Sequence, residues 1–211
     1  MRQRIWLLSI LAVCVVAGIF AATYFMGNRM SPTAVAQVKE VTVEQEEFVE
    51  IKQNRALLRS LGHEVPEASD EQLIERLLTP KLIAQEAERR GLSVPEADID
   101  EQIASQRDAL EQIDPDDEQE AWILPLMAKT YEMKGVSEEQ HWQSERTREG
   151  YRHGLYLVAL RDDMVEKEEI TSEEQFDAYK QSLYDKIRDE IVYNYTLLDQ
   201  INVSIEEPSP L

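Results

Sequence analysis

The sequence has a single cysteine, Cys14, which lies inside an apolar stretch near the N-terminus. The rest of the chain therefore cannot form a disulfide framework, a cysteine-based metal site or a thiol nucleophile. It also has only seven glycines, none adjacent to another, and no G-x-S-x-G elbow, phosphate-binding loop or dinucleotide fingerprint. We therefore expect a protein that is not an enzyme and needs no cofactor.

Basic residues are scarce. The 211 residues include 22 Lys and Arg against 42 Asp and Glu, giving a net charge of −20. Such an acidic surface repels phosphate backbones, so we expect no nucleic-acid partner. Most of the acidic residues are expected to lie on solvated helix faces.

Charged residues are absent from Ile5 to Met26, although Arg2 and Arg4 precede this run. At about 1.5 Å per residue the run is roughly 33 Å long, enough to cross a bilayer core as a helix. The arginines favour a cytoplasmic N-terminus and an extracytoplasmic body, in a single-pass cell-membrane protein. Cleavage between Ala36 and Gln37, after the signal-peptidase-like sequence AVA, is the alternative.

The expected organisation has five parts. They are a cytoplasmic N-terminus (1–4), a transmembrane signal anchor (5–26), a tether (27–37), a helical chaperone-like domain (38–206) and a flexible tail (207–211).

Helix N-cap patterns recur along the body, each a hydroxyl residue followed three positions later by Gln or Glu. They are Thr42 with Gln45, Ser69 with Gln72, Ser93 with Glu96, Ser137 with Gln140, and Thr171 with Glu174. These patterns predict at least five helices. Gly62 is expected to end the first helix, and Pro80 to kink or divide the second.

Two longer helices are predicted, one over 137–164 and a final one whose apolar stripe runs from Phe176 to Ile201 over about seven turns. Only 36–43 and 201–206 are expected to be extended, paired as a small ribbon. The predicted fold is mainly α: a transmembrane helix, then an irregular multi-helix domain with a long C-terminal helix and at most a small two-stranded β ribbon.

One stretch, LIERLLTPKLIAQEAERRGLSVPEADIDEQI (residues 73–103), resembles the N-terminal chaperone region of the SurA, PrsA and PpiD type of extracytoplasmic foldase. The positions that carry the resemblance are Leu77, Leu78, Leu82, Ile83, Ala84, Ala87, Gly91, Ser93, Ile99 and Ile103. Trigger factor shares this general helical architecture. The resemblance implies chaperone or scaffold activity. No strand-rich, glycine-rich parvulin domain follows, so prolyl-isomerase activity is not implied.

The centre of that stretch predicts a helical hairpin. Gly91 can supply the left-handed residue that ends one helix, and Ser93 can cap the next. A rigid hairpin of this kind holds its partner helices apart and can leave an apolar concavity between them. Its use would be to grip a partner rather than to catalyse a reaction.

His141, Glu145, Glu149 and His153 recur every four residues and could bind a divalent ion. On one continuous helix, however, His141 and His153 would diverge by roughly 120° around the axis. We therefore expect a solvated face and no metal site.

Aromatic and methionine side chains gather in the middle of the chain and are the candidates for client binding. They are Trp122, Met127, Tyr131, Met133, Trp142, Tyr151 and Tyr156. Such side chains suit surfaces that accept varied apolar partners, but they also suit an ordinary core.

The predicted function is that of a membrane-anchored extracytoplasmic chaperone, a holdase that binds non-native or exported polypeptides in an apolar cleft. The alternative is a structural or regulatory protein that docks one specific membrane or envelope partner. A homodimer formed through the long final helix is also possible.

Overall fold

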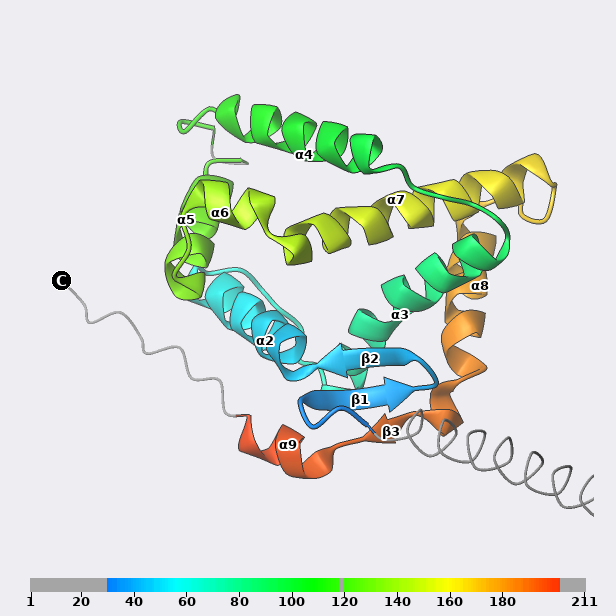
Figure 1. Cartoon of the computed structure of the whole chain (residues 1–211). Helices are drawn as coiled ribbons and strands as arrows, with labels where there is room; N and C mark the ends of the chain where they lie inside the picture. Colours follow the sequence, from blue (N-terminus) through cyan, green and yellow to red (C-terminus); the bar gives the residue numbers. More distant parts are fainter. Residues whose placement is uncertain (1–29, 118–119, 202–211) are drawn as a thin grey trace, which may run out of the picture.

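The computed structural model describes residues 30–117 and 120–201, which form eight α-helices and one small sheet (Figure 1). The predicted transmembrane helix (5–26) and the predicted tail (207–211) lie outside the described residues. Within the described ranges, no helix is long and apolar enough to cross a membrane.

The sheet has three strands rather than the predicted two. β1 (Ala34–Val38) and β2 (Val41–Glu44) form a hairpin, and β3 (Val192–Tyr193) pairs antiparallel with the other edge of β1. The stretch predicted as one strand therefore folds back on itself at Lys39, whose φ is 51°. β3 takes the free edge of β1, and residues 202–206 of the second predicted strand lie outside the described residues.

The predicted tether, 27–37, overlaps β1. Ala34, Val35 and Ala36 are completely buried between the two neighbouring strands and the helices that cover them. The ordered domain therefore begins before residue 38, because these small apolar side chains gain more from burial than from exposure as a linker.

The helices follow in chain order. They are α2 (Gln45–Ser60), α3 (Asp70–Arg89), α4 (Glu96–Glu111), α5 (Ile123–Lys134), α6 (Glu138–Gln143), α7 (Glu145–Glu166), α8 (Glu173–Asp185) and α9 (Tyr195–Gln200), with a short 3-10 helix η1 at Arg188–Glu190.

The predicted caps are correct for α3 and α6, where Ser69 and Ser137 each form a full capping box. Three predicted caps are wrong. Glu44, not Thr42, caps α2 through a reciprocal arrangement with Glu47, and Ser172, not Thr171, caps α8. Pro95, not Ser93, stands at the N-cap of α4, where its missing N–H would have had no helical partner.

Of the two effects predicted for Pro80, a kink or a division of the helix, division does not occur. The helix runs unbroken from Asp70 to Arg89 with Pro80 inside it. Leu78, Leu82 and Ile83 are buried on either side of the proline, and this packing offsets the lost backbone hydrogen bond.

Both predicted long helices are interrupted. The helix predicted over 137–164 breaks at Ser144. The backbone of Ser144 is extended, with ψ 139°, so α6 ends there, and the Ser144 hydroxyl caps the start of α7. The prediction of a final helix of about seven turns is wrong, because α8 stops at Asp185 and the chain continues through η1, β3 and α9. Ile187 and Ile191 are buried as their spacing predicted, but the chain between them turns so that β3 can cover the open edge of β1.

Three apolar clusters form the core. The first joins the sheet to α2, α3 and α9, and includes Val43, Phe48 and Leu78. The second joins the C-terminal halves of α3 and α7 to α8, around Leu160 and Phe176. The third joins α4, α6 and the N-terminal half of α7. α3 contributes to the first and second clusters, and α7 contributes to the second and third.

Polar contacts lock the second cluster from outside. Arg90, at the end of α3, donates hydrogen bonds to Glu86 (2.9 Å), Asp163 (3.2 Å) and Glu169 (3.1 Å), and also to the Tyr179 hydroxyl (3.2 Å). The Arg90 side chain is only 14% exposed. One guanidinium therefore ties α3 to α7, to the loop after α7 and to α8.

Candidate polypeptide-binding site

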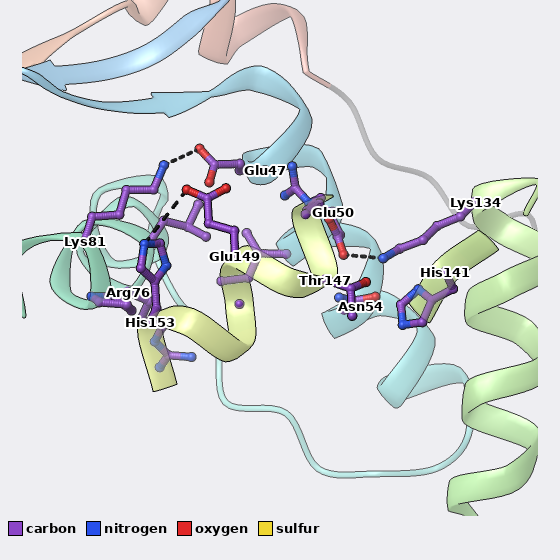
Figure 2. A pocket seen from close by; sticks show the side chains of 15 residues that line it. Glu47, Glu50, Asn54, Arg76, Lys81, Lys134, His141, Thr147, Glu149 and His153 are labelled. Atoms are coloured by element: carbon purple, nitrogen blue, oxygen red, sulfur yellow. Dashed lines mark hydrogen bonds and ion pairs between the residues drawn. The ribbon is translucent and has the colours of Figure 1, made fainter. Parts of the chain in front are cut away.

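An open cavity of about 450 Å³ is lined by residues of α2, α3, α5, α6 and α7 (Figure 2). α2 contributes Glu47 and Glu50 to its lining, and α3 contributes Arg76 and Lys81. The opposite wall comes from the start of α7, which contributes Thr147, Gly150 and His153 among others. Residues far apart in sequence therefore share one charged hollow.

Ion pairs fix most charges of this cavity. Lys81 donates to Glu47 (2.8 Å) and to the Thr42 carbonyl (2.7 Å), which ties α3 to the sheet and α2. Glu50 pairs with Lys134 (2.6 Å) and with Arg146. Figure 2 shows these carboxylates turned toward their cationic partners across the hollow.

Arg76 differs from the other cations of the cavity. Within the described ranges it makes no hydrogen bond or ion pair, and it is exposed. Its guanidinium therefore keeps its donors available to a bound group.

Both histidines considered at the sequence level face this cavity, although a continuous helix would have separated them. The break at Ser144 turns α6 relative to α7, so that His141 and His153 line the same hollow. Burial lowers the pKa of both, with Lys134 adding to the effect at His141. Glu145 instead pairs with Arg152 (3.2 Å), and no group of side chains in the described ranges could hold a metal ion.

A second hollow, of about 510 Å³, lies on the other side of α7 and is more apolar. Its lining comes from Gln102 of α4 and from α7, which contributes Thr147, Gly150, Tyr151, Gly154, Leu155 and Val158. Val158 is 42% exposed, so part of its apolar side chain is open to this hollow.

α5 presents a third apolar surface. Its sequence, ILPLMAKTYEMK, is mostly apolar, yet none of its side chains is buried. Leu126, Met127, Tyr131 and Met133 are all only partly covered. An amphipathic helix normally buries one stripe against its domain, so α5 has apolar surface left over for a partner.

The predicted client-binding residues divide into two groups. Trp142 and Tyr156 are buried in the third and second clusters, and the Tyr156 hydroxyl donates to Glu88 (3.0 Å). They support the frame in this conformation. The other five remain at least partly accessible: Trp122, Met127, Tyr131, Met133 and Tyr151.

The accessible aromatics are held by ring contacts. Trp122 lies 4.5 Å from the ring of His63, and Tyr131 lies 5.1 Å from the ring of His141. Tyr151 packs 6.4 Å from Trp142, and burial raises the pKa of both Tyr131 and Tyr151. These contacts hold the rings in place and leave part of each surface open.

The motif residues build the hairpin between α3 and α4. Seven of them are buried: Leu78, Leu82, Ile83, Ala84, Ala87, Ile99 and Ile103. Leu77 is partly buried. Gly91 has φ 84°, and the Leu92 N–H bonds the Ala87 carbonyl (3.0 Å) while the Gly91 N–H bonds that of Glu88 (2.9 Å). This is the glycine-terminated helix end that the sequence predicted.

The match to known families covers this hairpin. The family described as the SurA-like N-terminal domain matches residues 1–118, more than half of the 211-residue chain. The chain belongs to this family. The match includes the sheet hairpin and α2 to α4, whereas α5 to α9 lie beyond it. No parvulin family matches. No curated protein and no solved structure shows a significant match.

Sequence reasoning missed the charged cavity. Its residues come from five helices, and the spacing within any one of them gave no sign that Glu47, Arg76 and His153 meet. One signal was present: Gly150 and Gly154 stand four apart within a helix, where glycine is unfavourable without a local reason.

Proposed function

We propose that this protein is a chaperone of the holdase type, which binds non-native or exported polypeptides reversibly and lacks prolyl-isomerase activity. The observation that carries the proposal is α5, an apolar helix with no buried side chain in a domain whose other large helices bury theirs. Membership of the SurA-like N-terminal domain family supports it.

Binding would follow from burial of apolar client segments against Leu126, Met127 and Met133 of α5 and in the hollow beside α7. Each Å² of apolar surface removed from water contributes about 25 cal/mol, so a client segment that buries only a small area binds weakly and reversibly. Release would need no nucleotide, because a client that folds withdraws its apolar side chains.

The same proposal places the domain outside the cytoplasm, held by residues 5–26 as a single-pass anchor with a cytoplasmic N-terminus. The length of that apolar run and the preceding Arg2 and Arg4 support this topology. A cysteine reporter placed at Ser172, which lies at the start of α8, would test it by labelling with an impermeant maleimide in intact cells in a Cys14→Ser background.

Suppression of aggregation tests the holdase function directly. The purified full chain, with mild detergent equal in all arms, is mixed with several unrelated unfolded proteins, and light scattering is followed. We expect dose-dependent suppression of every client. The double variant Met127→Ser and Met133→Ser should suppress several-fold less, while Val165→Ser, exposed elsewhere on α7, should match the parent.

The outcomes separate the two function classes. Suppression of several clients, reduced by the α5 variant, supports the holdase. A folded chain that suppresses none at several-fold excess contradicts it, and favours a protein that docks one dedicated envelope partner.

A further inference from the structure

The charged cavity and the apolar hollow are neighbours, separated only by the first turns of α7. Thr147 and Gly150 line both of them. A ligand that crosses α7 at this point can therefore reach Arg76 and His153 on one side and Leu155 on the other.

Gly150 has no side chain, so it leaves room for a ligand backbone to pass close to α7. It is helical, its φ is not positive, and a Cβ built on it would meet nothing within 4 Å. The same holds for Gly154, one turn on. Neither backbone strain nor packing within the described residues therefore requires glycine here, whereas close approach of another backbone would.

The charges of the cavity differ in sign from those of the whole chain. Its lining holds four cations, Arg76, Lys81, Lys134 and Arg146, against three carboxylates, Glu47, Glu50 and Glu149. The chain as a whole has a charge of −20. A local positive excess in an acidic protein favours an anionic group at this point.

Among the described cations that line the cavity, Arg76 is the one without an ion pair. The carboxylates Glu47 and Glu50 are occupied by Lys81, Lys134 and Arg146. Arg76 has no such partner in the described ranges, and desolvation together with the charges of Arg76 and Arg59 lowers the pKa of Arg55. Its fork of N–H donors fits a carboxylate in bidentate geometry.

We propose that the two hollows form one site for an extended polypeptide segment that carries an acidic side chain close to apolar side chains. The carboxylate binds Arg76, the backbone crosses α7 over Gly150, and the apolar side chains enter the hollow lined by Tyr151, Leu155 and Val158. This inference rests on the proposed function and names the client segment that the site prefers.

Fluorescence anisotropy with three labelled peptides tests it. Each is a short glycine–serine peptide with two phenylalanines, and the residue between them is glutamate, glutamine or lysine. With the full chain, we expect the glutamate peptide to bind about two- to five-fold more tightly than the glutamine peptide, since Arg76 is exposed to solvent. The lysine peptide should bind most weakly, and added salt should reduce the differences.

Variants assign the preference to the site. Arg76→Gln should remove the difference between the glutamate and glutamine peptides. Arg188→Gln, which makes the same charge change on exposed η1, should preserve it. Gly150→Leu should weaken the binding of all three peptides while the domain stays folded, because the new side chain blocks the path of the peptide backbone over α7.

The results separate this inference from the holdase function. Equal binding of the glutamate and glutamine peptides, or tightest binding of the lysine peptide, would overturn it even if aggregation is suppressed. No binding of any peptide by a chain that suppresses aggregation would also overturn it. Failure of both assays would remove the proposed function as well.

Discussion

The two halves of α7 lie in contrasting surroundings. From Tyr156 onward the helix buries Tyr156, Leu160 and Met164 against α3 and α8, and Arg90 holds it through Asp163. From Glu145 to Leu155 it has no buried side chain and borders two hollows, and the apolar hollow continues along the exposed side of the helix to Val158. The same helix is thus a core element at one end and an accessible surface at the other.

This difference assigns separate tasks to the two ends. The half from Tyr156 onward, the locked end, keeps α3, α7 and α8 in fixed positions. The half that borders the two hollows, the open end, can therefore leave apolar surface uncovered without collapse of the domain. Substitutions at the locked end should therefore change stability, and those at the open end should change binding.

The largest effect is expected from Leu160→Ala. Leu160 is completely buried, so its truncation should lower the free energy of unfolding by about 2–5 kcal/mol. Val158→Ala, two residues earlier in the apolar hollow, should change it by about 0.5 kcal/mol or less. Urea unfolding followed by circular dichroism measures both, and equal losses would erase the contrast between the packed side of α7 and the side that lines the apolar hollow.

Arg90→Gln should come next, with a loss of about 2–3 kcal/mol, because Glu86 and Asp163 would remain poorly solvated without their partner. Arg152→Gln is the matched change at the open end, where Arg152 pairs with the exposed Glu96. It should cost about 1 kcal/mol or less. A larger loss of unfolding free energy for Arg152→Gln than for Arg90→Gln would contradict the assignment of the stabilising contacts to the Arg90 end of α7.

Acid should loosen the locked end through Glu86. Hydrogen bonds from Arg89, with further ones from Arg90 and Tyr179, lower the pKa of Glu86 from 4.5 to about 2. A lowered folded-state pKa gives stability that is present above pH 4.5 and is lost as pH falls from 4.5 toward 2.

Denaturant titrations between pH 6 and pH 3 measure this loss. Glu86→Gln should show a smaller decline than the parent, while Glu111→Gln, exposed at the end of α4, should decline as the parent does. Parallel curves for the parent and Glu86→Gln would show that Glu86 does not carry the pH dependence.

The smallest effects distinguish two kinds of glycine. Gly91→Ala should destabilise the domain by about 1 kcal/mol, because φ at Gly91 is 84°. Gly150→Ala should stabilise it by up to about 1 kcal/mol, because alanine is the better helix former and its Cβ meets nothing. Thermal unfolding should therefore shift in opposite directions. A destabilising Gly150→Ala would mean that packing within the domain requires this glycine.

The sequence predicted what depends on neighbours along the chain. The amphipathic stripe of α3, the capping boxes at Ser69 and Ser137 and the glycine end at Gly91 are all local features, and the structure has them. Of these features, the stripe of α3 and the glycine end at Gly91 also carried the family resemblance, which the match to residues 1–118 confirms.

What the sequence could not predict depends on distant contacts. The break between α8 and β3 exists because β1, some 150 residues earlier, has an open edge. The unbroken α3 at Pro80 depends on packing around Leu78 and Ile83, and the cavity depends on the turn at Ser144. Only the pair Gly150 and Gly154 hinted at the site.

The most direct measurement of the central claim is client crosslinking at two valines of α7. Val158 lines the open hollow and is 42% exposed, while Val165 lies at the locked end and is 53% exposed. A photoreactive benzoylphenylalanine is placed at one or the other position of the full chain, and an unfolded client is added before irradiation. We predict strong crosslinks from position 158 and few from position 165. Equal crosslinking, or more from position 165, would contradict the assignment of client binding to the open end.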